Sequence, residues 1–332
     1  MPRSRSTLLT VSLAATLAGA LLLPAALATA AESKSTVVVA RDPQSIDARN
    51  RADAARVTRL FERALLAFTG KGSAPEAWRE LGLVPTDVVA IKVNCNDWTI
   101  RLSPHPELVT ALTKSLATVI PENQIIVYER RTSDLKNAGF TPNTSAVGVR
   151  FFGNDEGGGY DPEQRLTRIV TKTATKIINL ASLKTVDGSG VVAKLTNLVV
   201  GGSSDGFGMS CFLKNHVGSL VDEDMSKCHN DPDMLAEIAS RPAIRQKTML
   251  VLADGLRATY QRGVPWYWGG IILGKDPVAA ETVAFQVVNE KRVAEGVAPL
   301  ALPGHVRTAD ATYHLGNSSL ERIARVDLTT SD

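Results

Sequence analysis

The stretch "VVAIKVNCND" (88–97) decides the expected fold, because a short apolar run rich in valine and isoleucine ends abruptly in polar residues. Strands that are buried on both faces of a sheet have this appearance, as continuous apolar segments without alternation. Four further segments share the pattern: "QIIVYER" (124–130), "KIINLASLK" (176–184), "TMLVLADG" (248–255) and "GGIILGKDP" (269–277). The sequence therefore predicts five buried strands.

Helical segments are predicted between several of these strands. The segment 103–120 has Pro106 at a helix start, followed by apolar residues at helical spacing. The segment 276–292 begins with Asp276 as a helix N-cap and Pro277 at the first helical position. Alternation of strands and helices predicts an α/β fold with an open, largely parallel sheet flanked by helices on both faces.

The N-terminus has the pattern of a secretion signal. Arg3 and Arg5 precede an apolar run over residues 8–23, and "ALATAAES" (26–33) fits the small-x-small cleavage rule. We expect cleavage after Ala30, which predicts an exported protein, periplasmic or extracellular, without stable membrane insertion after cleavage. An uncleaved anchor is the alternative. Residues 31–332 are expected to form a single α/β domain, and a division into two lobes near residue 150 is left open.

Charge and cysteine content exclude some classes of function. The net charge is +3, and loss of the signal removes two arginines, so the remaining chain is nearly neutral and lacks the basic footprint of a nucleic-acid binder. Cys95, Cys211 and Cys228 include no C-x-x-C pair, which excludes a four-cysteine cluster built from this chain alone. Cys211 and Cys228 form a disulfide in one interpretation, and all three cysteines are buried and reduced in the other.

Polar side chains follow the predicted strands where each one ends. In open α/β sheets this carboxyl edge is where ligands bind. Glu129 and Arg130 also end a strand, although they have an alternative interpretation as water-facing residues, and Asp254 and Asp276 have alternatives as a turn residue and a helix cap. The side chains expected to line a shared crevice are Lys92, Asn94, Lys184, Asp254 and Asp276.

The segment "CFLKNHVGSL" (211–220) places Lys214, Asn215 and His216 side by side after a glycine-rich loop. We expect Lys214 and Asn215 at the crevice. His216 is the candidate general acid or base, because its ordinary pKa is nearest neutrality, with Lys214 and Asp254 as further candidate catalytic residues. A structural role for His216 is the alternative. The loop "GVPWYWGG" (263–270) is a candidate lid or wall.

The ordered set "VVAIKVNCND", "IINLASLKT", "CFLKNHVGSL", "LADGL" and "GGIILGKDPVAAETV", followed by "PGHVRTADATYHLGNSSLERIARVDL", resembles the bacterial and archaeal family catalogued as domain of unknown function 362. The resemblance covers roughly residues 85–328. It implies a shared pattern at Lys92, Asn94, Lys184, Lys214, Asn215 and the Asp276–Pro277 pair. It implies no settled activity. Some members carry ferredoxin-type cysteine motifs, which this chain lacks.

Three functional hypotheses follow. In the first, the protein is an enzyme whose crevice binds a small anionic molecule, with reaction and cofactor unassigned. Lys92, Lys184 and Lys214 would hold carboxylate or phosphate groups of that molecule. Asn94 and Asn215 would orient it. In the second, His216, Cys228 and His229 make a metal or redox site, although their spacing matches no recognised metal motif, so no metal ligand is assigned. In the third, the same crevice captures a ligand without turnover.

Overall fold

The structure is a computed structural model that describes residues 34–95, 102–186, 208–229, 231 and 233–330. Residues Ser33–Asp332 make one compact unit. The predicted signal (1–30) lies outside the described residues. Strands on both sides of residue 150 belong to one sheet. Within the described part, none of the helices combines the length and the apolar content that crossing a membrane requires.

An eight-stranded sheet with the order β10-β1-β9-β8-β5-β2-β3-β4 forms the centre of the unit. All neighbouring strands are parallel except those that pair with β9. The α/β fold with a largely parallel sheet is therefore confirmed. The strands are β1 (Ser35–Arg41), β2 (Val89–Lys92), β3 (Ile125–Glu129), β4 (Arg150–Gly153), β5 (Lys176–Ser182), β8 (Thr248–Gln261), β9 (Val264–Gly274) and β10 (Ile323–Thr329), with β6 (Lys184–Thr185) and β7 (Met209–Ser210) forming a separate small sheet.

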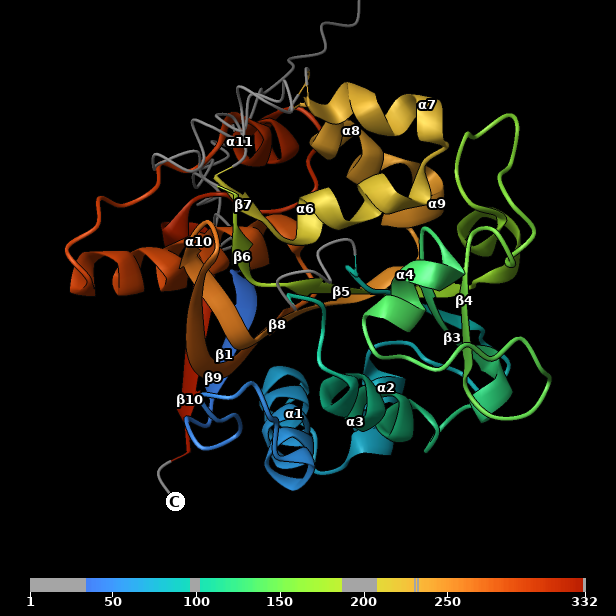
Figure 1. Ribbon diagram of the computed structural model, residues 1–332, viewed down its shortest axis with the longest axis horizontal. Coiled ribbons are helices and arrows are strands. Elements are labelled where there is room, and N and C mark those ends of the chain that lie inside the picture. The colour runs from blue at the N-terminus through green and yellow to red at the C-terminus, as the bar shows by residue number, and fades with distance from the viewer. Residues whose placement is uncertain (1–33, 96–101, 187–207, 230, 232, 331–332) are drawn as a thin grey trace, which may run out of the picture. The chain divides into compact units, whose positions relative to one another are not determined.

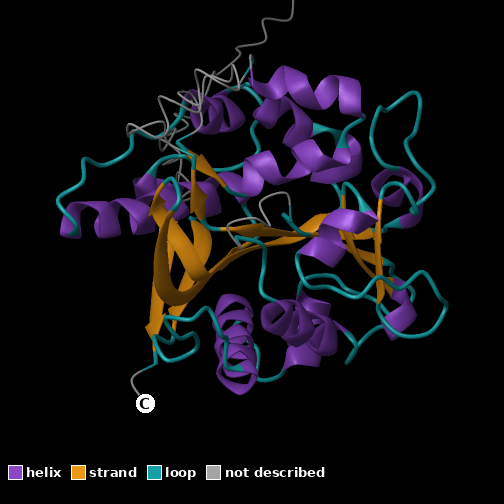
Figure 2. Ribbon diagram, in the orientation of Figure 1, coloured by secondary structure: helices purple, strands orange, loops and turns teal. Residues whose placement is uncertain are grey.

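Helices lie on both sides of the sheet (Figures 1 and 2). One side holds α1 (Ala54–Thr69), α2 (Ala74–Glu80) and α3 (Pro106–Leu116). The other side holds α6 (Phe212–Asn215), α7 (Asp222–Met225), α8 (Met234–Ser240), α9 (Pro242–Arg245), α10 (Pro277–Ala294) and α11 (Gly304–Ala311). The short α4 (Thr132–Asn137) follows β3, and the 3-10 turns η4 (His216–Ser219) and η5 (Ser226–His229) continue α6 and α7. Further turns are η2 (Glu122–Gln124), the π-turn η3 (Ile169–Thr173) and η6 (Leu320–Arg322).

Alternation along β2 decides which side chains reach the site. Val89 and Ile91 belong to the core shared with α1 and α3, whereas Ala90 belongs to a core on the other face. Because side chains of a strand alternate between faces, Lys92 shares the face of Ala90. It therefore points toward the layer that contains α6 and η4.

The direction of β9 overturns one expectation. β9 is antiparallel to both β1 and β8, and its last residue, Gly274, pairs with Val37 and Val251 near the starts of those strands. Asp276 thus lies at the amino edge of the sheet, where the parallel strands begin, so its predicted place in the crevice is wrong.

The segment "GVPWYWGG" is also not a loop: most of it is the first half of β9, in a hairpin with β8. Aromatic residues favour strands, and the turn lies just before them, at Gly263 with φ 77°.

Asp276 instead joins three segments. Its Oδ1 accepts from the N–H groups of Val278 and Ala279, which caps α10, and its Oδ2 accepts from Ser35 Oγ at 2.5 Å and Asn317 N at 2.8 Å. Asp276 is therefore an N-cap and also a link between β1 and the C-terminal region. It should contribute more to the stability of the fold than a helix cap alone.

We predict that Asp276→Ala lowers the free energy of unfolding by about 2 kcal/mol or more, above the typical ~1 kcal/mol of a lost N-cap. Asp53→Ala is the matched control, because Asp53 caps α1 through Ala55 and Arg56 and is exposed. Urea unfolding measures both variants. Equal losses for the two variants would show that Asp276 is only a helix cap.

Candidate functional site

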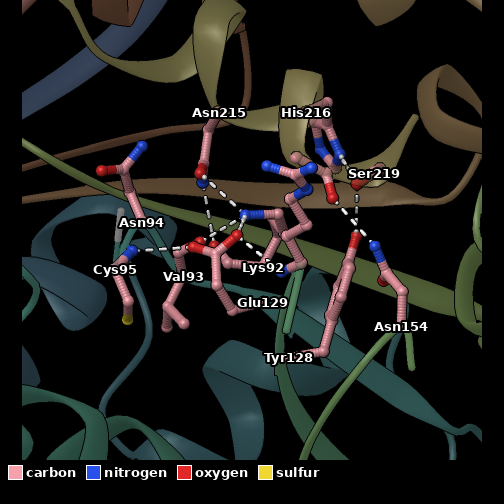
Figure 3. Close-up of polar contacts among 12 residues, drawn as sticks. Lys92, Val93, Asn94, Cys95, Tyr128, Glu129, Asn154, Asn215, His216 and Ser219 are labelled. Atoms are coloured by element: carbon pink, nitrogen blue, oxygen red, sulfur yellow. Dashed lines mark hydrogen bonds and ion pairs between the residues drawn. The ribbon is translucent and has the colours of Figure 1, made fainter. Parts of the chain in front are cut away.

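A buried ion pair lies where β2 and β3 end. Lys92 Nζ is 2.8 Å from Glu129 Oε1, and the two side chains are only 1% and 4% exposed. Lys92 Nζ also donates to Val93 O at 2.5 Å and to Asn215 Oδ1 at 3.3 Å (Figure 3). A lysine in this position is tolerated because each of its three N–H groups has an acceptor.

Glu129 is equally well satisfied. Besides Lys92, it accepts from the backbone N–H groups of Cys95 at 2.7 Å and Arg130 at 2.7 Å. These charge-assisted bonds fix the chain that leaves β2 against the end of β3. The interpretation of Glu129 as a water-facing residue is wrong. One feature of the sequence points to this pairing. Glu129 ends β3, and Lys92 ends the neighbouring strand β2.

Asn215 attaches the α6 segment to the sheet. Its amide nitrogen donates to Lys92 O at 2.9 Å and Asn179 Oδ1 at 2.8 Å, and Asn179 in turn donates to Phe212 O at 2.9 Å. The amide therefore faces inward and fixes α6 over β2 and β5. Asn179, in the middle of β5, was missed from the sequence because it looked like an ordinary member of an apolar run.

Gly218 allows η4 to approach the ion pair. A Cβ atom at this position would lie 2.9 Å from Glu129 Oε1 and 3.2 Å from Lys92 Nζ. The carbonyl of Gly218 accepts from Asn154 Nδ2 at 2.9 Å, which joins η4 to the loop after β4. Any side chain here would have to displace one member of the pair.

A crevice of about 270 Å³ opens beside the ion pair, at the carboxyl edge of β2 and β3. Four of the residues predicted from the sequence line it together. We call it the carboxyl-edge crevice; its lining comprises Lys92, Asn94, Lys214, Asn215, Glu129, Arg130, Arg131, Asp134, Gly218 and Cys228, with Val217 and Met225. Lys184 is one contact away, since its Nζ donates to Asn94 Oδ1 at 2.6 Å.

Two crevice groups have pKa values displaced toward neutrality. Burial lowers the pKa of the Lys214 ammonium, and Arg262 lowers it further against an opposing effect of Cys228. Burial raises the pKa of the Asp134 carboxyl, and the nearby Glu129 carboxylate raises it further.

Arg130, at the outer part of the crevice, is paired with Asp222 at 2.9 Å. Basic groups therefore outnumber acidic groups among the described lining residues.

His216 does not line this crevice with Lys214. Its ring is buried, and Nδ1 lies 3.3 Å from Ser219 Oγ, which also contacts Tyr128 OH at 3.1 Å. Burial and the charge of Lys92 lower the pKa of His216 to about 3, so the imidazole is neutral at physiological pH. The geometry therefore gives no support to the predicted role of His216 as the crevice acid or base.

Asp254 is also separated from Lys214. It follows Leu250 and Leu252 in strand alternation and so points to the opposite face, toward the start of α3. There it accepts from His105 N at 2.6 Å and His105 Nδ1 at 2.9 Å. Asp254 therefore lies on the other face of the sheet from Lys214 and His216, because side chains alternate between faces along β8.

Cys95, Cys211 and Cys228 are free and buried, so the disulfide between Cys211 and Cys228 is not formed. In the part of the chain that the structure describes, no three His, Cys, Asp or Glu side chains gather closely enough to hold a metal ion. The side chain of His229 lies outside that part, and the metal hypothesis stays untested.

Comparison with known protein families gives one result. The family described as a domain of unknown function, DUF362, matches residues 89–286. The chain belongs to the DUF362 family. The DUF362 match includes the ion pair, the whole described crevice lining and Asp276. No curated protein and no solved structure matches the chain.

Removal of either partner of the ion pair should be costly. We predict that Lys92→Met and Glu129→Gln each lower the free energy of unfolding by about 3–5 kcal/mol, because each leaves an uncompensated buried charge. The double variant should lose clearly less free energy of unfolding than the sum of the losses in the two single variants. Urea unfolding of all four proteins measures the coupling; additivity within about 0.5 kcal/mol would mean that the pair does not act as a unit.

Gly218→Ala should destabilise the protein by about 1–3 kcal/mol through overpacking against the ion pair. The control is Gly304→Ala, since a Cβ at Gly304 meets no atom within 4 Å at the start of α11. That change should be neutral or slightly stabilising. Thermal denaturation compares the two, and a Gly218→Ala variant as stable as Gly304→Ala would contradict the close approach.

Proposed function

We propose that this DUF362 protein is exported and that its carboxyl-edge crevice binds a small anionic molecule. The supporting observation is Lys214. Its side chain is half-buried in the crevice, where Arg130 and Arg131 share the one carboxylate of Asp222 and so leave a net positive charge, and burial lowers the pKa of Lys214. An anion beside Lys214 would stabilise the charged form of the ammonium.

Each crevice residue has a distinct part in this proposal. Lys214 supplies the main charged contact, and the two arginines extend the positive field to the mouth of the crevice. Lys92 is already neutralised by Glu129, so its role is to shape the floor rather than to hold the ligand. Asn94 is aligned by Lys184, which leaves the amide nitrogen of Asn94 as a donor suited to a carboxylate or phosphate oxygen.

Acid–base chemistry in the crevice, if an enzyme operates there, would rest on Asp134 and Lys214. These are the crevice groups whose pKa values move toward neutral pH, which is a property of catalytic acids and bases. His216 and Asp254 are not among the described residues that line the crevice. Capture of the ligand without turnover uses the same contacts, so product analysis separates the two possibilities.

Sulfate is a suitable probe because its charge does not change between mildly acidic and alkaline pH. We predict that Lys214→Gln raises the dissociation constant of sulfate about tenfold or more, the effect of one lost charge-assisted hydrogen bond. Lys114→Gln, at an exposed position in α3, should leave it unchanged. Calorimetry at constant ionic strength measures all three proteins, and an unchanged constant in Lys214→Gln would refute the proposed site.

The pH dependence adds a second readout. A lowered pKa means that Lys214 loses its proton at a lower pH than an ordinary lysine, and only the protonated form attracts the anion. Sulfate affinity should therefore be highest below that lowered pKa and fall as the pH rises through it. The Lys214→Gln variant should lack this step; the same step in both proteins would assign the titration to another group.

Export rests on the sequence of residues 1–30. We predict that protein recovered from outside the cytoplasm begins at Ala31 or within a few residues of it. N-terminal sequencing or intact mass measures this. Full-length protein that stays in the membrane fraction would support an uncleaved anchor instead.

A further inference from the structure

A second, larger cavity opens at the opposite edge of the sheet. It has a volume of about 530 Å³ and lies where β1 and β8 begin and where β9 passes into α10. Its described lining shares no residue with that of the carboxyl-edge crevice. The volume is within the range of about 300–1,000 Å³ that is typical of small-molecule sites. We call it the amino-edge cavity.

Apolar side chains form part of the wall of the amino-edge cavity, beside the polar Asn179 and Thr248, and come from elements far apart in the sequence. They combine aromatic and aliphatic side chains of α1, α6, α8, α9 and the loop after α11: Phe68, Phe212, Ala239, Ile244 and Leu315. An extended or ring-shaped apolar group would find contact on several sides here. Burial of such a group is favourable in proportion to the apolar area removed from water.

The exposed part of the lining is basic. Lys34, Arg245 and Lys275 are exposed and line the cavity together. Asp276 is the acidic residue among the described lining, and its two oxygens already accept four hydrogen bonds from Ser35, Val278, Ala279 and Asn317. The mouth therefore presents a net positive charge, which suits an anionic head group.

The buried part of the lining carries an unsatisfied polar atom. His216 is 1% exposed, and its Nε2 has no hydrogen-bond partner among the described residues, whereas its Nδ1 is occupied by Ser219. A buried ring nitrogen without a partner costs free energy, and such atoms are uncommon in folded proteins. A neutral hydroxyl or amide on a bound molecule would supply the missing partner, since a hydroxyl both donates and accepts.

We propose that the amino-edge cavity binds an amphiphilic carboxylate. The carboxylate lies at Lys34, Lys275 and Arg245, the apolar body packs against Phe212, Ala239 and Ile244, and a hydroxyl at the far end pairs with His216 Nε2. This site is independent of anion binding at Lys214. It assigns His216 to ligand recognition in the amino-edge cavity instead of acid–base chemistry in the crevice.

Calorimetric titration of the mature protein with hexanoate, octanoate, decanoate and dodecanoate tests the site, each beside its ω-hydroxy counterpart. Ala239→Phe fills the cavity and should abolish binding of the carboxylates. Lys275→Glu, at an exposed position, should raise their dissociation constants about threefold or more, and it decides the question if Ala239→Phe fails to fold. Lys114→Gln, at an exposed position in α3, is the matched control and should leave these constants unchanged. Saturating sulfate in every titration occupies the site proposed at Lys214, which keeps this result distinct from the sulfate test.

At one chain length the ω-hydroxy acid should bind more tightly than the simple acid, and His216→Phe should remove that preference while retaining binding. Failure of every carboxylate to bind the wild-type protein would overturn the proposal. Binding that is indifferent to both Ala239→Phe and Lys275→Glu would overturn it equally. A lack of preference for the hydroxyl at every length would overturn the assignment of His216.

Discussion

The buried ion pair between Lys92 and Glu129 is the interaction on which the candidate site depends. Two charges removed from water are stable only when every donor and acceptor is satisfied. Here the pair meets that condition by recruiting Val93 O, Asn215 Oδ1 and two backbone N–H groups. Those contacts fix the ends of β2 and β3. The ion pair also leaves no room for a side chain at position 218, where η4 packs against it. The crevice walls are thus positioned by the need to satisfy one ion pair.

Part of this arrangement is predictable from the sequence. Strands buried on both faces are continuous apolar runs, so β2, β3, β5, β8 and β9 were found. Parallel strands end at one edge, so Lys92 and Asn94 were expected together, and Lys214 and Asn215 were expected beside them. β1 was overlooked although "TVVVA" (36–40) carries the same signal, whereas β10 has an irregular burial pattern at the sheet edge that gives no clear periodicity.

The rest depends on long-range geometry that local patterns do not contain. An apolar run does not reveal its direction, so the antiparallel β9 moved Asp276 to the other edge. A residue at a strand end does not reveal its face until the register is known, so Asp254 was placed with Lys214 but lies with His105.

Adjacent residues on a short helix also point in different directions. Asn215 lines the carboxyl-edge crevice, whereas His216 lines the amino-edge cavity, and the segment 211–219 separates two chemically different spaces.

The central claim is that the crevice beside Lys214 is an anion site, and a crystal structure of the mature protein grown with sulfate tests it most directly. The account predicts a sulfate ion within hydrogen-bonding distance of Lys214 Nζ, with the Lys92–Glu129 pair intact beneath it. A well-ordered crevice that contains only water, with sulfate bound elsewhere on the protein, would contradict the account.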